Sequence, residues 1–104
     1  MVQPETRIVR KIKEYLTEEG IFHFKVWGNE HMMAGLPDLI CCVNGLFVGM
    51  EVKTEEGDTT ARQVYVHQRI RQSLGIVGVV RSVSDAENLV RFARAITPGN
   101  GRTV

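Results

Sequence analysis

The sequence predicts an α/β domain in which helices flank a mixed β-sheet, with its elements in the order αβββαβα. Three patterns predict this class. In three separate segments, apolar residues recur at every third or fourth position, the period of an amphipathic helix. Asn44-Gly45, a strong signal for a tight hairpin, joins two apolar runs of strand length. A further such run lies between the last two helical segments, so helices and strands alternate in the second half of the chain.

The first helix is predicted over 4–19, because Pro4 suits a first helical turn and Gly20 is a helix terminator. Its apolar stripe consists of Ile8, Val9, Ile12, Tyr15 and Leu16. A strand is predicted over 21–27, where β-branched and aromatic residues are frequent. We expect the mostly polar segment 28–35 to be a mobile or functional loop.

The hairpin is predicted from a short apolar strand over 39–43 that returns antiparallel along 46–53. Alternation along the second strand separates a core face from a second face that carries both of its charges. The core face has Leu46, Val48, Met50 and Val52, and the second face has Phe47, Gly49, Glu51 and Lys53. A polar loop over 55–60 follows the hairpin.

The rest of the chain predicts a second helix over 60–74, a strand over 76–81 and a third helix over 84–95, capped by Ser84. Pro98 and two glycines then indicate a flexible C-terminal tail at 97–104. No internal repeat interrupts this order.

Length and composition fit one soluble domain, which we place at 1–96 of the 104 residues. No run of about 18 apolar residues indicates a membrane span. The first 20 residues are charged and lack the apolar stretch of a signal peptide, so we expect a cytoplasmic protein. Cys41 and Cys42 are adjacent on a strand, which favours reduced, buried cysteines over a disulfide or a zinc site.

Hairpin register predicts a site at Asp38 and Glu51. Counting outward from Asn44-Gly45 places these two carboxylates opposite each other. Facing carboxylates repel each other unless a cation lies between them, and the single charge of Lys53 can neutralise only one of them. We therefore predict a divalent metal site. The plain alternative is a surface strand with an incidental ion pair, worth about 0–1 kcal/mol.

Two more polar residues allow two interpretations each. Glu5 extends the buried stripe of the first helix toward the same site, or it only complements the helix dipole in the first turn. Gln63 forms a capping box with Thr60, or it heads the stripe of the second helix and turns inward. One turn later we expect His67 to be solvated or half-buried.

The net charge of +1 argues at first against an acidic partner such as DNA. Setting Glu5, Asp38 and Glu51 aside as metal ligands leaves the basic residues in excess, and a bound cation adds to this. The basic residues cluster on two helices: Arg7, Arg10, Lys11 and Lys13 on the first, and Arg62, Arg69 and Arg71 on the second. A phosphate-binding surface is therefore compatible with the composition.

Several segments together resemble a known family. They are Glu5 at the head of a basic helix, Gly35-Leu36-Pro37-Asp38-Leu39-Ile40, Phe47-Val48-Gly49-Met50-Glu51-Val52-Lys53, Gln63 after a polar loop, and Gly75 before the last strand. In this order they resemble the VRR-NUC domain, the virus-type replication and repair branch of the PD-(D/E)XK nuclease superfamily. The resemblance covers roughly 5–89. The motifs are specific as a set, although each piece alone is common.

The resemblance implies a restriction-endonuclease-like PD-(D/E)XK core and a DNA endonuclease dependent on Mg²⁺ or Mn²⁺. It implies metal ligands at Glu5, Asp38, Glu51 and the Val52 carbonyl, a water-positioning role for Lys53 and a helper role for Gln63. Lys25 also looks like a family feature, and with Arg7, Arg10, Lys11 and Arg62 it is a candidate contact to nucleic acid.

Small stand-alone members of the family, of phage and bacterial type, look like homodimeric Holliday junction resolvases. The resemblance thus implies a homodimer that cuts branched DNA in repair, in a bacterial cell or a phage-infected host, without an organic cofactor. Two alternatives stay open. One is a catalytically silent nucleic-acid binding module of the same fold, and the other is a flap-directed, nick-directed or sequence-preferring nuclease.

Overall fold

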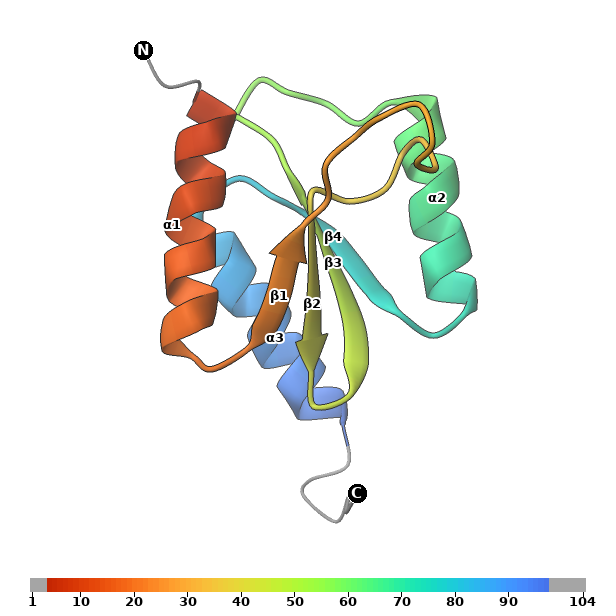
Figure 1. Cartoon of the computed structure of the whole chain (residues 1–104). Coiled ribbons are helices and arrows are strands. Elements are labelled where there is room, and N and C mark those ends of the chain that lie inside the picture. Colours follow the sequence, from red (N-terminus) through yellow and green to blue (C-terminus); the bar gives the residue numbers. More distant parts are fainter. Residues whose placement is uncertain (1–3, 98–104) are drawn as a thin grey trace.

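The computed structural model describes residues 4–97, so the predicted tail at 97–104 lies almost wholly outside the described residues. The elements follow the predicted order αβββαβα. They are α1 (Pro4–Glu18), β1 (Phe22–Lys25), β2 (Leu39–Val43), β3 (Leu46–Val52), α2 (Ala61–Gln72), β4 (Ile76–Val80) and α3 (Val83–Ile96) (Figure 1).

Helix ends are set mostly by the predicted local signals. Gly20, with a φ of 70°, follows the end of α1, and Thr60 caps α2 in a capping box. The cap of α3 was predicted wrongly: it is Ser82, whose side chain accepts a hydrogen bond from the Asp85 N–H. Ser82 has an extended backbone and so fits the cap position, whereas Ser84 lies inside the helix.

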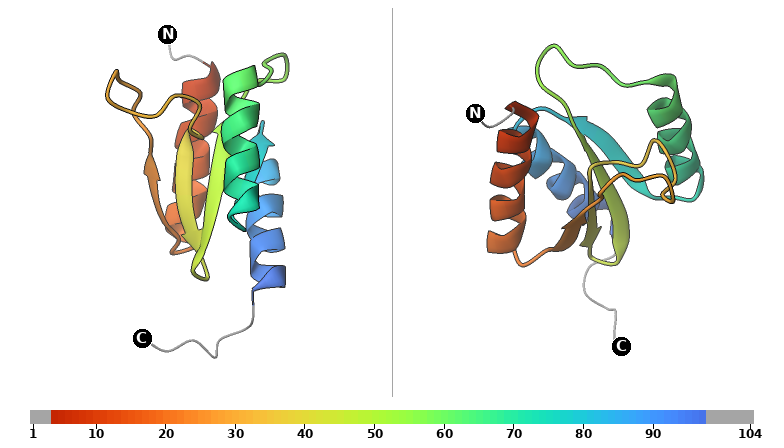
Figure 2. Two further views of the ribbon diagram at one scale, coloured as in Figure 1. Left: turned by 90° about the vertical axis from the view of Figure 1, so that its right-hand side faces the viewer. Right: turned by 45° about the horizontal axis from the view of Figure 1, so that its top comes forward.

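The four strands form one mixed sheet in the order β1-β2-β3-β4. Neighbouring strands are antiparallel except β3 and β4, which are parallel. α1 and α3 pack together on one face, and α2 packs on β4 from the other (Figure 2). Within the described residues β1 is an edge strand whose outer edge pairs with no other strand.

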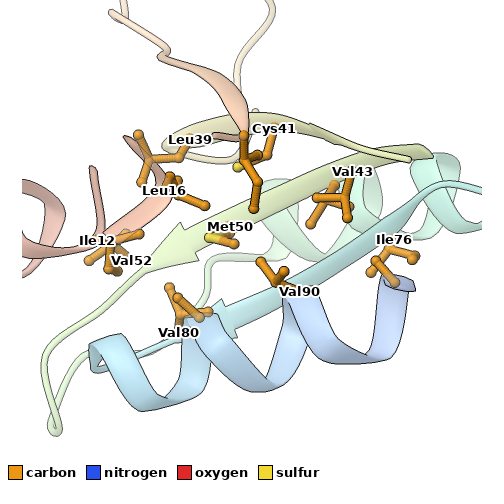
Figure 3. Packing of buried hydrophobic residues seen from close by; sticks show 14 of the residues in the cluster. Ile12, Leu16, Leu39, Cys41, Val43, Met50, Val52, Ile76, Val80 and Val90 are labelled. Atoms are coloured by element: carbon orange, nitrogen blue, oxygen red, sulfur yellow. The ribbon is translucent and has the colours of Figure 1, made fainter. Parts of the chain in front are cut away.

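The core lies between the sheet and the pair α1 and α3 (Figure 3). Ile12 and Leu16 of α1 and Val90 of α3 meet the predicted core face of β3, where Met50 and Val52 are fully buried. Burying such side chains stabilises a fold by about 1.5–3 kcal/mol each. The core face predicted for β3 is therefore confirmed.

The hairpin has the predicted register. Asn44 and Gly45 have positive φ angles of 52° and 86°, as the tightest hairpin turns require. Val43 pairs with Leu46 and, at the far end, Leu39 pairs with Met50. One further step along the two strands brings Asp38 opposite Glu51. Local turn chemistry thus sets the position of both carboxylates.

The two cysteines are free, and only one is buried. Cys41 points into the core, as predicted, but Cys42 is exposed, which corrects the expectation that both are buried. Neighbours on a strand point to opposite faces, and α2 packs on β4 and leaves the outer face of β2 open.

Among residues 4–97, no helix is both long enough and apolar enough to span a membrane.

Candidate active site

The candidate site lies at the end of the sheet where β2 begins, β3 ends and α1 starts (Figure 1). Asp38, immediately before β2, is fixed by two hydrogen bonds. Its backbone carbonyl accepts from the Val26 N–H at 2.8 Å, and its Oδ2 accepts from the Val52 N–H, also at 2.8 Å. The carboxylate is therefore held across the hairpin, beside the last residues of β3.

Two glycines let the segment before Asp38 approach the rest of the molecule. A Cβ at Gly49 would lie 2.7 Å from Cγ of Pro37, which is fully buried against this strand. Gly35 has a φ of 87°, and a Cβ there would lie 2.8 Å from the Arg62 carbonyl oxygen on α2. These contacts were not predicted from the sequence, although a glycine inside a strand is a known sign of close approach.

Glu51 is the most unusual group of the site, because only 2% of this acidic residue is exposed. Burial, and then the neighbouring Asp38 carboxylate, raise the pKa of Glu51 to about 8, while the Lys53 ammonium opposes the shift. Lys53 Nζ lies 3.7 Å from Glu51 Oε2, and Lys53 is itself largely buried. Two carboxylates and one ammonium thus share a confined space.

His67 faces Glu51 from α2, which sequence reasoning did not foresee. It is 4% exposed rather than solvated or half-buried, because α2 turns Val66 and His67 toward the sheet. Burial, with help from the positive charges of Arg71 and Lys53, lowers the pKa of His67 and favours the neutral imidazole. Its Nε2 lies 3.9 Å from Glu51 Oε1, and neither buried atom has a hydrogen-bond partner among residues 4–97.

Glu5 lies in the first turn of α1, with its side chain exposed rather than part of the buried stripe. It lines the same groove as Asp38, and its charge contributes to the raised pKa of Glu51. Among residues 4–97, no three His, Cys, Asp or Glu side chains meet closely enough to hold a metal by themselves. Glu5 is therefore near the carboxylate pair without completing a cluster.

The donors present fit a hard divalent cation. Within the part of the chain that the structure describes, Glu51 Oε1 is a buried oxygen without a hydrogen-bond partner, and Asp38 adds a second carboxylate. The N–H and C=O of a strand residue point the same way, so the Val52 carbonyl faces the Asp38 side, as its N–H does. Lys53 N–H points the other way, to the Val80 carbonyl. Oxygen donors of this kind suit Mg²⁺ or Mn²⁺.

Gln63 forms the capping box with Thr60, which is the first of its two predicted roles. Its Oε1 accepts from the Thr60 N–H at 2.9 Å, and its own N–H donates to Thr60 Oγ1 at 3.1 Å. The capping box therefore engages the amide oxygen at the start of α2. This end of α2 lies at the same end of the molecule as the start of α1 (Figure 1).

A groove of about 630 Å³ runs between α1 and β1 and reaches Asp38. Of the predicted nucleic-acid contacts, Arg10 and Lys25 line it, whereas Arg7 and Lys11 are exposed on α1 outside it. Arg62 lies on α2, where its Nε donates to the Ala34 carbonyl at 3.2 Å. The structure thus separates the five predicted basic residues into different surfaces.

The acidic loop after β3 is anchored by Arg81, which follows β4. The Arg81 guanidinium donates to the carbonyl oxygens of Thr54 and Gly57, the latter at 2.8 Å. No local motif predicts this contact, because it joins two segments more than twenty residues apart. It holds the loop directly beyond Lys53.

The comparisons with known proteins agree with this architecture. No protein-family model matches the sequence, and no curated protein does. A solved structure described as a VRR_NUC domain is similar to this chain, with a TM-score of 0.73 and 27% sequence identity. The match covers 86% of this chain and 97% of that one. The resemblance found in the motifs and the predicted fold class are therefore confirmed.

Proposed function

We propose that this protein, which has the fold of a VRR_NUC domain, is a nuclease that uses Mg²⁺ or Mn²⁺ to hydrolyse phosphodiester bonds in DNA. The observation that carries the proposal is the buried Glu51 carboxylate, with the half-buried Asp38 and the Lys53 ammonium beside it. A buried carboxylate whose pKa is raised by burial and by a neighbouring carboxylate is stabilised in its ionised form by a bound cation. The match to a VRR_NUC domain supports the same reading.

In this proposal each residue of the site has a separate task. Asp38, Glu51 and the Val52 carbonyl hold the cation, and Glu5 approaches it from α1. The bound cation would lower the pKa of a water and neutralise charge on the phosphate. The Lys53 ammonium, held beside Glu51, orients the attacking water and stabilises negative charge as it develops on the phosphate. Gln63 is proposed to assist from the start of α2.

The cleavage test compares the parent with an Asp38→Ala and Glu51→Ala double variant and with Lys53→Ala. We expect each to lose at least about 100-fold in cleavage of labelled DNA in Mn²⁺, since electrostatic groups of this kind contribute on that order. Glu55→Gln is the matched control, because it removes an exposed acid of the neighbouring loop. A double variant that cuts as fast as the parent would refute the nuclease proposal.

A catalytically silent DNA-binding module is the second candidate. It is favoured by the observation that, within the described chain, the site brings together only two carboxylates and not three. Measurements with and without a chelator distinguish the two functions. A binding module titrates DNA equally with Mg²⁺ and with EDTA and shows no cleavage, whereas a nuclease loses all turnover in EDTA.

For the substrate we propose branched DNA, such as a Holliday junction, cut by a homodimer whose twofold symmetry matches the junction. The proposed contact between copies is the free edge of β1, because antiparallel pairing of two such edges is itself twofold symmetric. Phe22 and Phe24 of this strand are 71% and 49% exposed, so the apolar surface beside the edge also favours a partner.

Light scattering tests the dimer. We expect twice the chain mass for the parent and a shift toward monomer for Phe22→Ser with Phe24→Ser, with secondary structure unchanged by circular dichroism. A parent that is monomeric well above the concentration used for cleavage contradicts it. Cleavage of a panel of junction, flap, nicked and linear DNA tests whether branched DNA is the preferred substrate. Equal cleavage rates on all of them would refute this preference.

A further inference from the structure

We infer that Trp27 and the groove beside it form a subsite for one unpaired DNA base, next to the carboxylate pair. The inference rests on the proposed function for its ligand, because a nuclease site makes DNA the expected occupant. Beyond the proposed nuclease activity, we identify the part of the substrate that this subsite binds, namely a base outside a duplex.

The position of Trp27 is the first argument. This side chain is the only tryptophan of the chain, and it is 71% exposed. It follows directly after Val26, whose N–H is bound to the Asp38 carbonyl at 2.8 Å. A large aromatic ring left in water at this point is available to a planar, apolar ligand. A base stacked on it would thus lie close to Asp38.

The charges around the ring are the second argument. Lys25 Nζ lies 4.8 Å from the centre of the Trp27 ring. Arg10 and Lys13 line the α1 side of the same groove. Stacking on an aromatic ring with cations beside it is how proteins bind single-stranded nucleic acid, because the cations take the phosphates while the ring takes the base.

The length of the basic stretch limits the occupant. α1 and β1 run side by side in opposite directions, so the end of β1 lies near the start of α1 (Figure 1). Arg10 and Lys13 follow Glu5 by about 8 and 12 Å along the helix axis. Beyond them the groove is lined by Glu14 and Glu18, which repel phosphate. The groove therefore suits a short unpaired segment rather than a long strand.

An unpaired base fits this subsite better than a duplex does. In a duplex the faces of each base are covered by its neighbours, and only an unpaired or flipped base offers a free face to a ring. Branch points and flaps supply such bases. The subsite would thus place a structural irregularity of the DNA beside the scissile phosphate.

Intrinsic fluorescence reports directly on the subsite, since Trp27 is the only indole. The metal-free parent in EDTA is titrated with a short oligothymidylate and with a blunt duplex of equal length. We expect saturable quenching by the single strand and much weaker quenching by the duplex. No quenching by the single strand, or equal quenching by both, overturns the inference.

Affinity gives the second readout, measured in EDTA by anisotropy of a labelled single strand. Trp27→Ala should weaken binding about tenfold, the lower part of the range for loss of one stacked base. Trp27→Phe should restore most of the affinity because it keeps a ring. Phe92→Ala, which removes an exposed ring on α3, should change nothing. Equal affinity of Trp27→Ala and the parent contradicts the subsite.

Cleavage by the same preparations in Mn²⁺ separates this inference from the nuclease proposal. If the parent cuts DNA while Trp27→Ala binds single strands as the parent does, the subsite is wrong and the nuclease stands. If the parent cuts no DNA in the panel, yet quenching and the tenfold loss are found, the subsite stands and the nuclease proposal fails.

Discussion

At the residue scale, Glu51 is the group whose burial destabilises the fold most clearly and whose carboxylate is best placed to bind a cation. Its carboxyl is buried against Asp38 on one side and a neutral His67 on the other, and Lys53 offers a compensating charge. Buried ionisable groups with strongly shifted pKa values are frequent at functional sites. The burial that destabilises the charged group without a ligand also favours binding of a ligand of opposite charge.

The first prediction concerns pH. The pKa of Glu51 is about 8 in the folded protein and 4.5 for a free side chain, so the folded state binds this proton more tightly. Without metal, the stability due to Glu51 protonation is fully present below about pH 4.5 and is lost as pH rises toward 8. Its size is on the order of a few kcal/mol.

Urea unfolding in EDTA at pH 5, 6.5 and 8 measures this effect. Glu51→Gln keeps the neutral form at every pH, so the variant should gain stability relative to the parent as pH rises. Comparing the two proteins cancels the titration of the remaining acids. A difference that does not change between pH 5 and pH 8 would show that Glu51 is ionised in the folded protein.

The second prediction concerns Gly49. An added methyl group would meet the ring of Pro37 at 2.7 Å, so Pro37 must shift and take Asp38 with it. Gly49→Ala should cost about 1–3 kcal/mol in unfolding free energy, typical of overpacking, and should lower cleavage as well. Gly78→Ala is the control, because its nearest neighbour is the end of the Leu89 side chain at 3.3 Å. Equal effects of the two substitutions would argue against the Pro37 contact.

Sequence reasoning found part of the site and missed part of it for physical reasons. Asp38 and Glu51 were placed together because a two-residue turn fixes register without any knowledge of the rest of the fold. His67 was missed because its burial depends on how α2 is rotated against the sheet. Gln63 had two local interpretations, and only the folded chain shows its oxygen in the capping box.

At the element scale, the hairpin and most helix ends were predictable because their signals are local. β1 is shorter than predicted, since strand pairing with β2 ends at Lys25 although the apolar pattern runs on to Trp27. The cap of α3 moved from Ser84 to Ser82 because two serines at similar positions carry the same signal. Boundaries of this kind depend on backbone pairing, which composition does not specify.

The third prediction concerns the loop after β3. Arg81→Met keeps the apolar stem but removes the donors that hold the Thr54 and Gly57 carbonyls. We expect faster amide hydrogen exchange over 54–60, with exchange in β2 and β3 unchanged. Arg91→Met is the control, as Arg91 is exposed and its guanidinium donates to Asn88 Oδ1 of the same helix. Unchanged exchange in the loop would mean that other contacts hold it.

At the scale of the whole molecule, the set of motifs predicted the fold, and the similar VRR_NUC domain structure agrees with it. The sequence could not reveal which surfaces stay open. The exposure of Trp27 and of Phe22 depends on β1 being an edge strand and on the groove between β1 and α1. Both features arise only when distant segments are assembled, and both bear on what the protein binds.

In the proposed nuclease, Asp38 and Glu51 together bind one divalent cation. Calorimetric titration with Mn²⁺ at about pH 8.5, where Glu51 is largely ionised, tests it most directly, because metal binding needs deprotonated ligands. We predict saturable binding to the parent and to Glu55→Gln, and its loss in an Asp38→Asn and Glu51→Gln double variant. A parent that binds no Mn²⁺, or a double variant that binds it as tightly as the parent does, would mean that Asp38 and Glu51 do not form a cation site.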